Sequence, residues 1–198
     1  MYIGKTQLIH SILLKKLQAI MDLNLPSDPV QRRNLFIGPP GVAKTTVAKQ
    51  LGLHAAGNKL NLDFRMGTEM NVEIIRDWVR HAPYRGLTVR LIDEIETTPP
   101  AAVTELRGYL DDLPRTVLFL ATSNKAVKDL AEPLQTRFKV WQFDPVQTSA
   151  IAEYLVARFP MLNPARLHDI ATKAAGNVRA ALTDADSELD VYQFRQAA

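Results

Sequence analysis

The sequence predicts an α/β fold, with five parallel strands lying between helices, and a small all-helical domain after it. Short apolar runs alternate with helical stretches over the first 144 residues, and this alternation is typical of a parallel sheet that is covered on both faces. After Asp144-Pro145 the strand-like runs stop and three helical patterns follow. We therefore expect two domains, which comprise residues 1–144 and 145–198.

The composition limits the class of protein. Of the 198 residues, 46% are hydrophobic and 23% are charged, which is usual for a globular chain, and no apolar run is long enough to span a bilayer. The absence of cysteine excludes disulfides and thiolate metal sites, and the four histidines lie too far apart in the sequence to suggest a metal site. A net charge of +3 permits a polyanionic partner without requiring one. We expect a cytoplasmic or nucleoid-associated protein with no membrane partner.

The expected elements follow one another regularly along the chain. An amphipathic helix is predicted over Thr6–Met21, and a polar loop that contains prolines follows it over Asn24–Arg33. Helices are also predicted over Thr45–Leu53 and Val72–His81. The five predicted strands are Asn34–Ile37, Leu60–Phe64, Thr88–Ile92, Thr116–Ala121 and Lys139–Phe143.

A glycine-rich loop between a strand and a helix carries the strongest functional signal. The loop has the sequence Gly38-Pro39-Pro40-Gly41-Val42-Ala43-Lys44-Thr45, and Thr46 follows in the helix. In this setting the backbone N–H groups of the loop and of the helix N-terminus converge on phosphates. Lys44 would contact the β- and γ-phosphates of a nucleotide, and the hydroxyl of Thr45 would bind Mg²⁺. We expect residues 38–46 to bind the nucleotide; the alternative is an ordinary strand–helix turn that happens to contain a lysine.

A second motif ends a predicted strand in two acids. Asp93 and Glu94 follow the apolar pair Leu91-Ile92, which puts their carboxylates at the carboxyl edge of the sheet, where ligands bind in open α/β folds. Asp93 would hold Mg²⁺, directly or through water, and Glu94 would be the general base that polarises the attacking water. Because Glu94 is a carboxylate rather than an amide or an aliphatic residue, the pattern favours hydrolysis over binding alone.

Together, the loop and the acidic strand end resemble the Walker A and Walker B motifs of AAA+ ATPases. The resemblance implies a P-loop AAA+ fold, in which helices sandwich a parallel five-stranded sheet and a small helical lid follows, and it implies ATP and Mg²⁺ as cofactors. Four further segments match the family and extend the resemblance over nearly the whole chain. They are Tyr2-Ile3-Gly4, Leu120–Asn124, Leu134–Phe138 and Gly176–Arg179.

The resemblance implies a role for each of these segments. Tyr2-Ile3-Gly4 would line the adenine pocket, and Asn124 would be the first sensor, which contacts the γ-phosphate or the attacking water. Arg137 would be the arginine finger, and Arg179 would be the second sensor. The ordinary alternatives are that Asn124 caps a turn and that Arg137 is a surface arginine at a helix end. Arg179 stands near the start of the last predicted helix, where a cation opposes the helix dipole unless an anion is near.

In this family the arginine finger reaches the γ-phosphate that the neighbouring subunit binds. The resemblance therefore implies a homo- or hetero-oligomer in which Arg137 completes the next subunit's site in trans. A single protomer would then hydrolyse ATP poorly. The lid, through Arg179, would report the nucleotide state as a hinge movement around Asp144–Val146.

Within the family, the chain is similar to the clamp-loader group, which contains the small subunits of replication factor C and the bacterial polymerase-III loader. The path from the acidic motif through Thr104-Glu105-Leu106-Arg107 to the sensor strand is short, whereas many remodelling members have a long insertion there. The resemblance implies a role in DNA replication, with DNA and a sliding clamp or another replication or recombination protein as partners. Clamp loaders also carry a collar domain, which we do not expect here, so a helicase loader, a transposition regulator and a branch-migration motor are alternatives.

A basic helix face is the candidate for DNA contact. One predicted helix places Arg76 and Arg80 away from its apolar side, and Arg107 adds positive charge. Contact with a phosphate backbone needs only such a stripe of charge. The alternative is a solvated helix face on which Glu73 and Asp77 balance the arginines.

Ala43 departs from the usual loop pattern, which has glycine before the lysine. Its methyl group is harmless if the backbone φ is negative and damaging if φ is positive. Because MoxR-like AAA+ ATPases also carry alanine here, we expect nucleotide binding to survive.

Two further functional classes stay open for this chain. A structural subunit that binds ATP without useful turnover is favoured by Ala43 and opposed by Glu94, Asn124 and Arg137; a MoxR-like protein-remodelling ATPase is favoured by Ala43 and Thr97–Pro100.

Overall fold

The computed structural model describes residues 32–57, 59–81 and 86–197. The predicted helix Thr6–Met21, the adenine-pocket segment Tyr2-Ile3-Gly4 and most of the predicted loop before Arg33 lie outside these ranges. The described chain forms two compact units. One contains the residues up to Gly38 together with Lys44–Phe143, and the other contains residues 39–43 together with the chain from residue 144 onward. The middle of the glycine-rich loop therefore groups with the last three helices, whereas Lys44 groups with the sheet.

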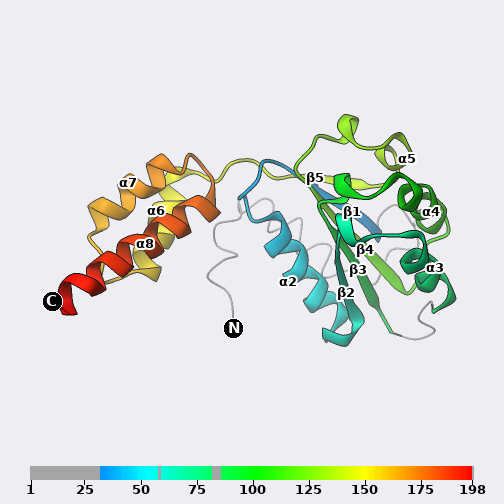
Figure 1. Cartoon of the computed structure of the whole chain (residues 1–198), viewed down its shortest axis with the longest axis horizontal. Coiled ribbons are helices and arrows are strands. Elements are labelled where there is room, and N and C mark those ends of the chain that lie inside the picture. The colour runs from blue at the N-terminus through cyan, green and yellow to red at the C-terminus, as the bar shows by residue number, and fades with distance from the viewer. Residues whose placement is uncertain (1–31, 58, 82–85, 198) are drawn as a thin grey trace. The chain divides into compact units, whose positions relative to one another are not determined.

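The sheet unit holds five parallel strands, as predicted (Figure 1). Leu35 pairs with Ala121 on one side and with Val140 on the other, which places the first strand between the fourth and the fifth. The first and fourth strands are buried along their whole length, and their apolar parts, residues 35–37 and 117–121, are continuous runs rather than alternating ones. The strands are β1 (Arg33–Ile37), β2 (Leu62–Met66), β3 (Thr88–Asp93), β4 (Val117–Ser123) and β5 (Lys139–Gln142), in the order β2-β3-β4-β1-β5.

Helices cover both faces of this sheet (Figure 1). The first described helix lies so close to one face that a Cβ on Gly52 would come within 3.0 Å of Leu62. The next two helices cover the other face, in a core that contains Trp78, Leu106 and Phe119. The helices are α2 (Lys44–Ala56), α3 (Val72–Arg80), α4 (Pro100–Asp111) and α5 (Glu132–Gln135), and the 3-10 turns are η2 (Lys59–Asn61), η3 (Gly67–Glu69), η4 (Ile95–Thr97) and η5 (Val127–Asp129).

Strand boundaries differ from the prediction by one or two residues, most clearly in β2 and β4. β2 begins at Leu62, because Lys59–Asn61 forms a 3-10 turn in which the side chain of Leu60 is 96% exposed. The apolar side chain of Leu60 was the misleading signal. β4 continues past Ala121 through Thr122 and Ser123, which are both buried. Polar residues can occupy such a strand end because they find hydrogen-bond partners there.

The second unit contains three helices, as predicted: α6 (Thr148–Arg158), α7 (Pro164–Lys173) and α8 (Val178–Ala197). Their apolar faces meet in a core of their own. α7 begins where a helix start is expected, because the Asn163 side chain accepts a hydrogen bond from the Ala165 N–H and proline occupies the first helical position. Within the described ranges, no helix combines the length and the apolar character that crossing a membrane would need.

Candidate functional site

Three strand ends meet at the carboxyl edge of the sheet. β3, β4 and β1 are consecutive neighbours, so the residues that follow them in the chain come close together. β1 leads toward Lys44 and Thr45 at the start of α2, β3 ends in Asp93 followed by Glu94, and β4 is followed by Asn124. The topology therefore collects the polar side chains of both predicted motifs and of the predicted first sensor at one edge.

Lys44, Asn124 and Glu94 form one connected hydrogen-bond chain. The buried Lys44 Nζ donates to the Gly38 carbonyl and to Asn124 Oδ1, each at 2.8 Å. Asn124 Nδ2 in turn donates to Glu94 Oε1 at 3.3 Å. The Asn124 backbone N–H donates to Glu96 Oε1 at 2.9 Å, which fixes the start of the loop after β4. A cation, an amide and a carboxylate are thus held side by side, which is the set of groups needed to bind a phosphate and to activate a water beside it.

Asp93 and Thr45 form the second half of the site. Thr45 Oγ1 donates to Asp93 Oδ1 at 2.7 Å, and Asp93 is buried. A hydroxyl and a carboxylate are hard oxygen ligands, and Mg²⁺ is commonly held by one or two such groups together with the phosphates of its nucleotide. The described residues contain no group of three or more acidic, histidine or cysteine ligands, so they offer no all-protein cage for a metal. The donor set therefore fits a Mg²⁺ ion that arrives with a nucleotide.

Thr122 is a site residue that the sequence did not reveal. Its side chain is 1% exposed, and Oγ1 donates to Asp93 Oδ1 while it accepts from the Glu94 N–H at 3.1 Å. One hydroxyl thus orients both acids of the second motif. Glu94 needs this support because its backbone has a φ of 53°, which is in the left-handed region and is unfavourable for a residue with a Cβ. A buried polar residue at the end of an apolar strand was the available signal.

Valine in place of Thr122 should keep the shape of the side chain and remove both hydrogen bonds. The free energy of unfolding should fall by about 1–3 kcal/mol, because the Glu94 N–H is left without its acceptor in a part-buried place. Chemical denaturation of the two proteins measures this difference. Serine at the same position keeps the hydroxyl and should recover most of the stability, whereas equal losses for valine and serine would mean that the methyl group matters instead.

The glycine-rich loop has an unusual backbone at Ala43. The φ of Ala43 is 72°, so the condition under which its methyl group was expected to be damaging is met. Left-handed backbone at a residue with a Cβ costs roughly 1–2 kcal/mol. Gly38, at the start of the loop, leaves no room for a side chain, because a Cβ there would lie 2.1 Å from the Phe143 carbonyl oxygen.

Glycine in place of Ala43 should remove this strain. We expect the free energy of unfolding to rise by up to about 1 kcal/mol, since part of the gain is offset by the greater freedom of glycine in the unfolded chain. Thermal or chemical denaturation provides the measurement. Ala48→Gly, in the buried middle of α2, is the matched control and should destabilise by about 1 kcal/mol or more. A loss of stability in Ala43→Gly equal to that of the control would contradict the strain.

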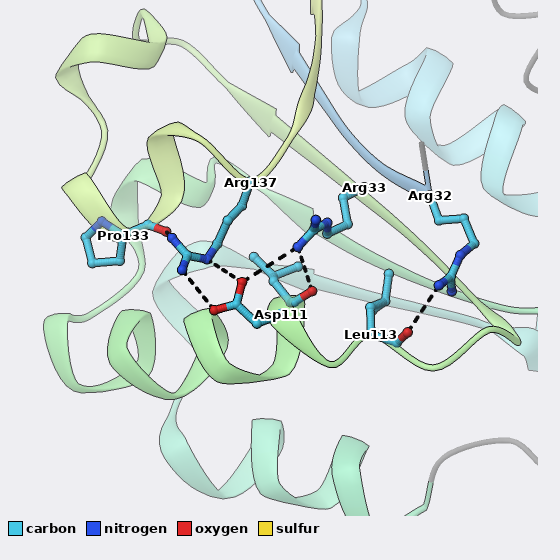
Figure 2. A network of polar contacts seen from close by, with 7 residues as sticks. Arg32, Arg33, Asp111, Leu113, Pro133 and Arg137 are labelled. Carbon is cyan, nitrogen blue, oxygen red and sulfur yellow. Dashed lines mark hydrogen bonds and ion pairs between the residues drawn. The ribbon is translucent and has the colours of Figure 1, made fainter. Parts of the chain in front are cut away.

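Arg137 lies away from the Lys44 group, at the amino edge of the sheet, and Figure 2 shows it beside Asp111 and Pro133. It precedes Lys139, which pairs with Asn34 near the amino end of β1, whereas Lys44 follows the carboxyl end of that strand. The length of β1 alone separates the two edges by about 13 Å. The guanidinium donates from Nε and Nη2 to the two carboxylate oxygens of Asp111, both at 2.8 Å. Arg137 therefore does not join the Lys44 group of the same protomer.

The Asp111–Arg137 pair changes the acidity of both groups. The hydrogen bond from Arg137 is the main cause that holds the pKa of Asp111 below its usual value. The same hydrogen bond raises the pKa of Arg137. Because the folded-state pKa of Asp111 is depressed, the pair is fully formed at neutral pH and is lost only as the pH falls through that lowered value.

The remaining predicted residues fall into two places. In the second unit, the backbone N–H groups of Val178 and Arg179 donate to the Gly41 carbonyl at 3.0 and 3.4 Å, so α8 begins at the middle of the glycine-rich loop. In the sheet unit, the Arg76 guanidinium lies 3.5 Å from Glu73 and 3.2 Å from Glu105. Of the two acids named in the alternative to DNA contact, only Glu73 pairs with Arg76, whereas Asp77 lies 2.8 Å from His81 Nδ1. Arg80 on α3 and Arg107 on α4 are exposed.

The fold and the site can be compared with known proteins. A model of the ATPase family associated with various cellular activities (AAA) matches residues 34–145. The replication factor C small subunit of Haloarcula marismortui is 27% identical over 127 residues, which are 60% of this chain and 39% of that protein. The corresponding protein of Thermofilum pendens is 31% identical over 121 residues, which are 57% of this chain and 37% of that protein. The chain thus matches only about two fifths of the length of these relatives.

A solved structure supports the fold independently. The RuvB Holliday junction branch migration motor of Thermotoga maritima aligns with 95% of this chain and 64% of its own, with a TM-score of 0.72 and 19% sequence identity. At that identity, the likeness concerns the fold alone.

Proposed function

The chain belongs to the AAA family of ATPases, and on this basis we propose that it binds ATP with Mg²⁺ and hydrolyses it, as part of an oligomer with a clamp-loader-like role on DNA. The observation that carries the proposal is the connected set of Lys44, Asn124 and Glu94, with Thr45 and Asp93 beside it. Each member has the chemical type that phosphoryl transfer to water requires, and all lie at the carboxyl edge of the sheet, at the start of α2 or at the ends of β3 and β4.

The geometry supports a division of roles among these residues. The Lys44 ammonium, which now bonds Asn124 and Gly38, would exchange these oxygens for those of the β- and γ-phosphates. Bound Mg²⁺ would neutralise charge on the phosphates, and Thr45 and Asp93 would hold it. Glu94 would accept the proton of the attacking water, and Asn124, already bonded to Glu94, would orient that water toward the γ-phosphate.

Arg137 supports an oligomer because of where it lies. A guanidinium at the amino edge of the sheet is too far from the Lys44 group of its own protomer to reach the same phosphate. Its proposed role in ATP hydrolysis therefore needs a second copy or a related subunit. We propose Arg179, near the start of α8, as the second sensor of the nucleotide state.

The role on DNA rests on the relatives. The curated relatives are replication factor C small subunits, and the structural neighbour is a Holliday junction branch migration motor. In this chain Arg76, Arg80 and Arg107 are all exposed, but Arg76 is balanced by glutamates. We propose backbone contact through Arg80 and Arg107, with a sliding clamp or another replication or recombination protein as a further partner. Such contact would weaken steeply as salt rises.

One experiment tests the whole proposal. Phosphate release from ATP is measured over a range of protein concentrations, with and without Mg²⁺ and primed duplex DNA, while light scattering follows the size of the assembly. Turnover should require Mg²⁺, should rise more than proportionally with protein concentration, and should increase with DNA. A protein that bound no adenine nucleotide and stayed monomeric at every concentration would overturn the proposal.

A second candidate function is a subunit that binds ATP without turning it over. The strained backbone of Ala43 is the observation that favours it, because it stands beside the phosphate-binding Lys44. Under this alternative, Ala43→Gly would be needed before any ATP hydrolysis could be measured. Under the main proposal, the native chain already hydrolyses ATP once it is assembled.

A further inference from the structure

Asp111 occupies a position that helix stability does not explain. It is the last residue of α4, and a carboxylate at the C-terminal end of a helix faces the negative end of the helix dipole. Its side chain is 46% exposed, so it is not fixed by burial. What it does contact is Arg137, through both carboxylate oxygens, with Arg33 Nη1 also within 3.9 Å (Figure 2).

The end of α4 is already anchored without Asp111. The buried Arg33 donates from Nη1 to the Leu110 carbonyl at 2.7 Å. The buried Arg32 donates to the carbonyl of Leu113, just after the helix, at 3.2 Å and to that of Val117, at the start of β4, at 3.3 Å. Both arginines thus hold this end of α4 through main-chain oxygens, as Figure 2 shows in part. The carboxylate of Asp111 is therefore available for a different task.

That task concerns the orientation of Arg137. Asp111 takes its Nε and Nη2 donors, and the Pro133 carbonyl accepts from Nη1. A guanidinium has five N–H groups, so two of them stay available for an anion after these three bonds. The side chain is 18% exposed, and it is held from two sides before any partner arrives. An arginine side chain that is fixed in advance loses less freedom when it meets a phosphate.

We propose that Asp111 is a positioning residue for Arg137, holding the guanidinium in the orientation in which it completes the ATP site of a neighbouring subunit. This inference rests on the proposed role of Arg137 in trans. Asp111 itself would touch neither the nucleotide nor the water. It would act as a carboxylate acts behind a metal-bound histidine, by fixing the direction of the group in front of it.

The test replaces Asp111 with asparagine, which keeps the shape and removes the charge. In the assembled full chain, the kcat for ATP hydrolysis should fall about tenfold, equivalent to about 1.4 kcal/mol of transition-state stabilisation, while the KM for ATP and the melting temperature stay unchanged. Asp112→Asn is the matched control, because Asp112 is the exposed neighbouring carboxylate, and it should leave kcat unaltered. Asp111→Glu keeps the charge and should restore part of the loss.

A double variant separates positioning from a general structural effect. If Asp111 acts through Arg137, Asp111→Asn should change nothing further in an Arg137→Ala background. An equal fall in both backgrounds, or a kcat for Asp111→Asn equal to or above the native value, would overturn the positioning role. If Arg137→Ala itself turned over ATP normally, the proposed role of Arg137 would fail instead. If Arg137→Ala were inactive and Asp111→Asn fully active, only the inference about Asp111 would fail.

Discussion

Glutamine in place of Glu94 should lower ATP turnover by about 10²- to 10⁴-fold, the range that general-base catalysis usually contributes. The amide cannot accept the proton of the attacking water. The Asn124 bond can be kept, because the glutamine side chain still offers a carbonyl oxygen. ATP affinity should therefore stay close to that of the native chain. Phosphate release measures the turnover, and equilibrium binding of a fluorescent ATP analogue measures the affinity.

Glu153→Gln is the matched control for this variant. Glu153 is an exposed carboxylate on α6, in the other unit, and its loss should change neither quantity. A Glu94→Gln protein with turnover within a few-fold of the native value would exclude Glu94 as the base. A protein that also lost nucleotide binding would point to collapse of the site rather than to loss of the base.

Alanine in place of Arg137 should lower ATP turnover by roughly 10³- to 10⁵-fold, because the guanidinium offsets charge that develops on the transferred phosphoryl group. The fold should survive, since the ion pair with Asp111 is solvent-exposed on its acidic side and such pairs contribute roughly 0–1 kcal/mol. Phosphate release and melting temperature are the two measurements. Arg115→Ala is the control, because Arg115 is exposed in the turn between α4 and β4.

Mixing two inactive variants tests whether Arg137 acts in trans. Arg137→Ala keeps an intact Glu94, and Glu94→Gln keeps an intact Arg137. In a mixed assembly, some Arg137→Ala sites will border a Glu94→Gln neighbour whose guanidinium completes them, so turnover should reappear. A mixture that stays as inactive as its components, although it assembles, would mean that Arg137 serves its own protomer or no ATP site at all.

The fold could be predicted because each element had a separate signal. The buried strands β1 and β4 each contain a continuous apolar run, and neither side of them faces water. The prediction was wrong at Leu60, where one apolar residue adjoins a strand without belonging to it. Exposure of a single side chain depends on the turn that carries it, and the apolar pattern does not encode that turn.

The candidate site was predictable only in part. Local sequence motifs identify Lys44, Asp93, Glu94 and Asn124, and the sheet brings these residues together. Thr122 could not be assigned, because its two hydrogen bonds depend on how β4 lies beside β3 in the folded sheet. The bond from Arg137 to Asp111 joins residues that are 26 positions apart, in segments without a common motif. Such pairings follow from packing rather than from local sequence.

β1 has a consequence for how far the chain tolerates insertions and deletions. The amino end of β1 is Arg33, which shares Asp111 with Arg137, the residue proposed to complete a neighbouring subunit's ATP site. The carboxyl end of β1 is followed by Gly38 and the protomer's own phosphate-binding loop. A strand is stiff, and each residue advances it by about 3.3 Å. One extra residue would shift these two chemical groups apart and turn the following side chains to the wrong face of the sheet. We therefore expect five residues to be an invariant length here, even where the composition of the strand drifts.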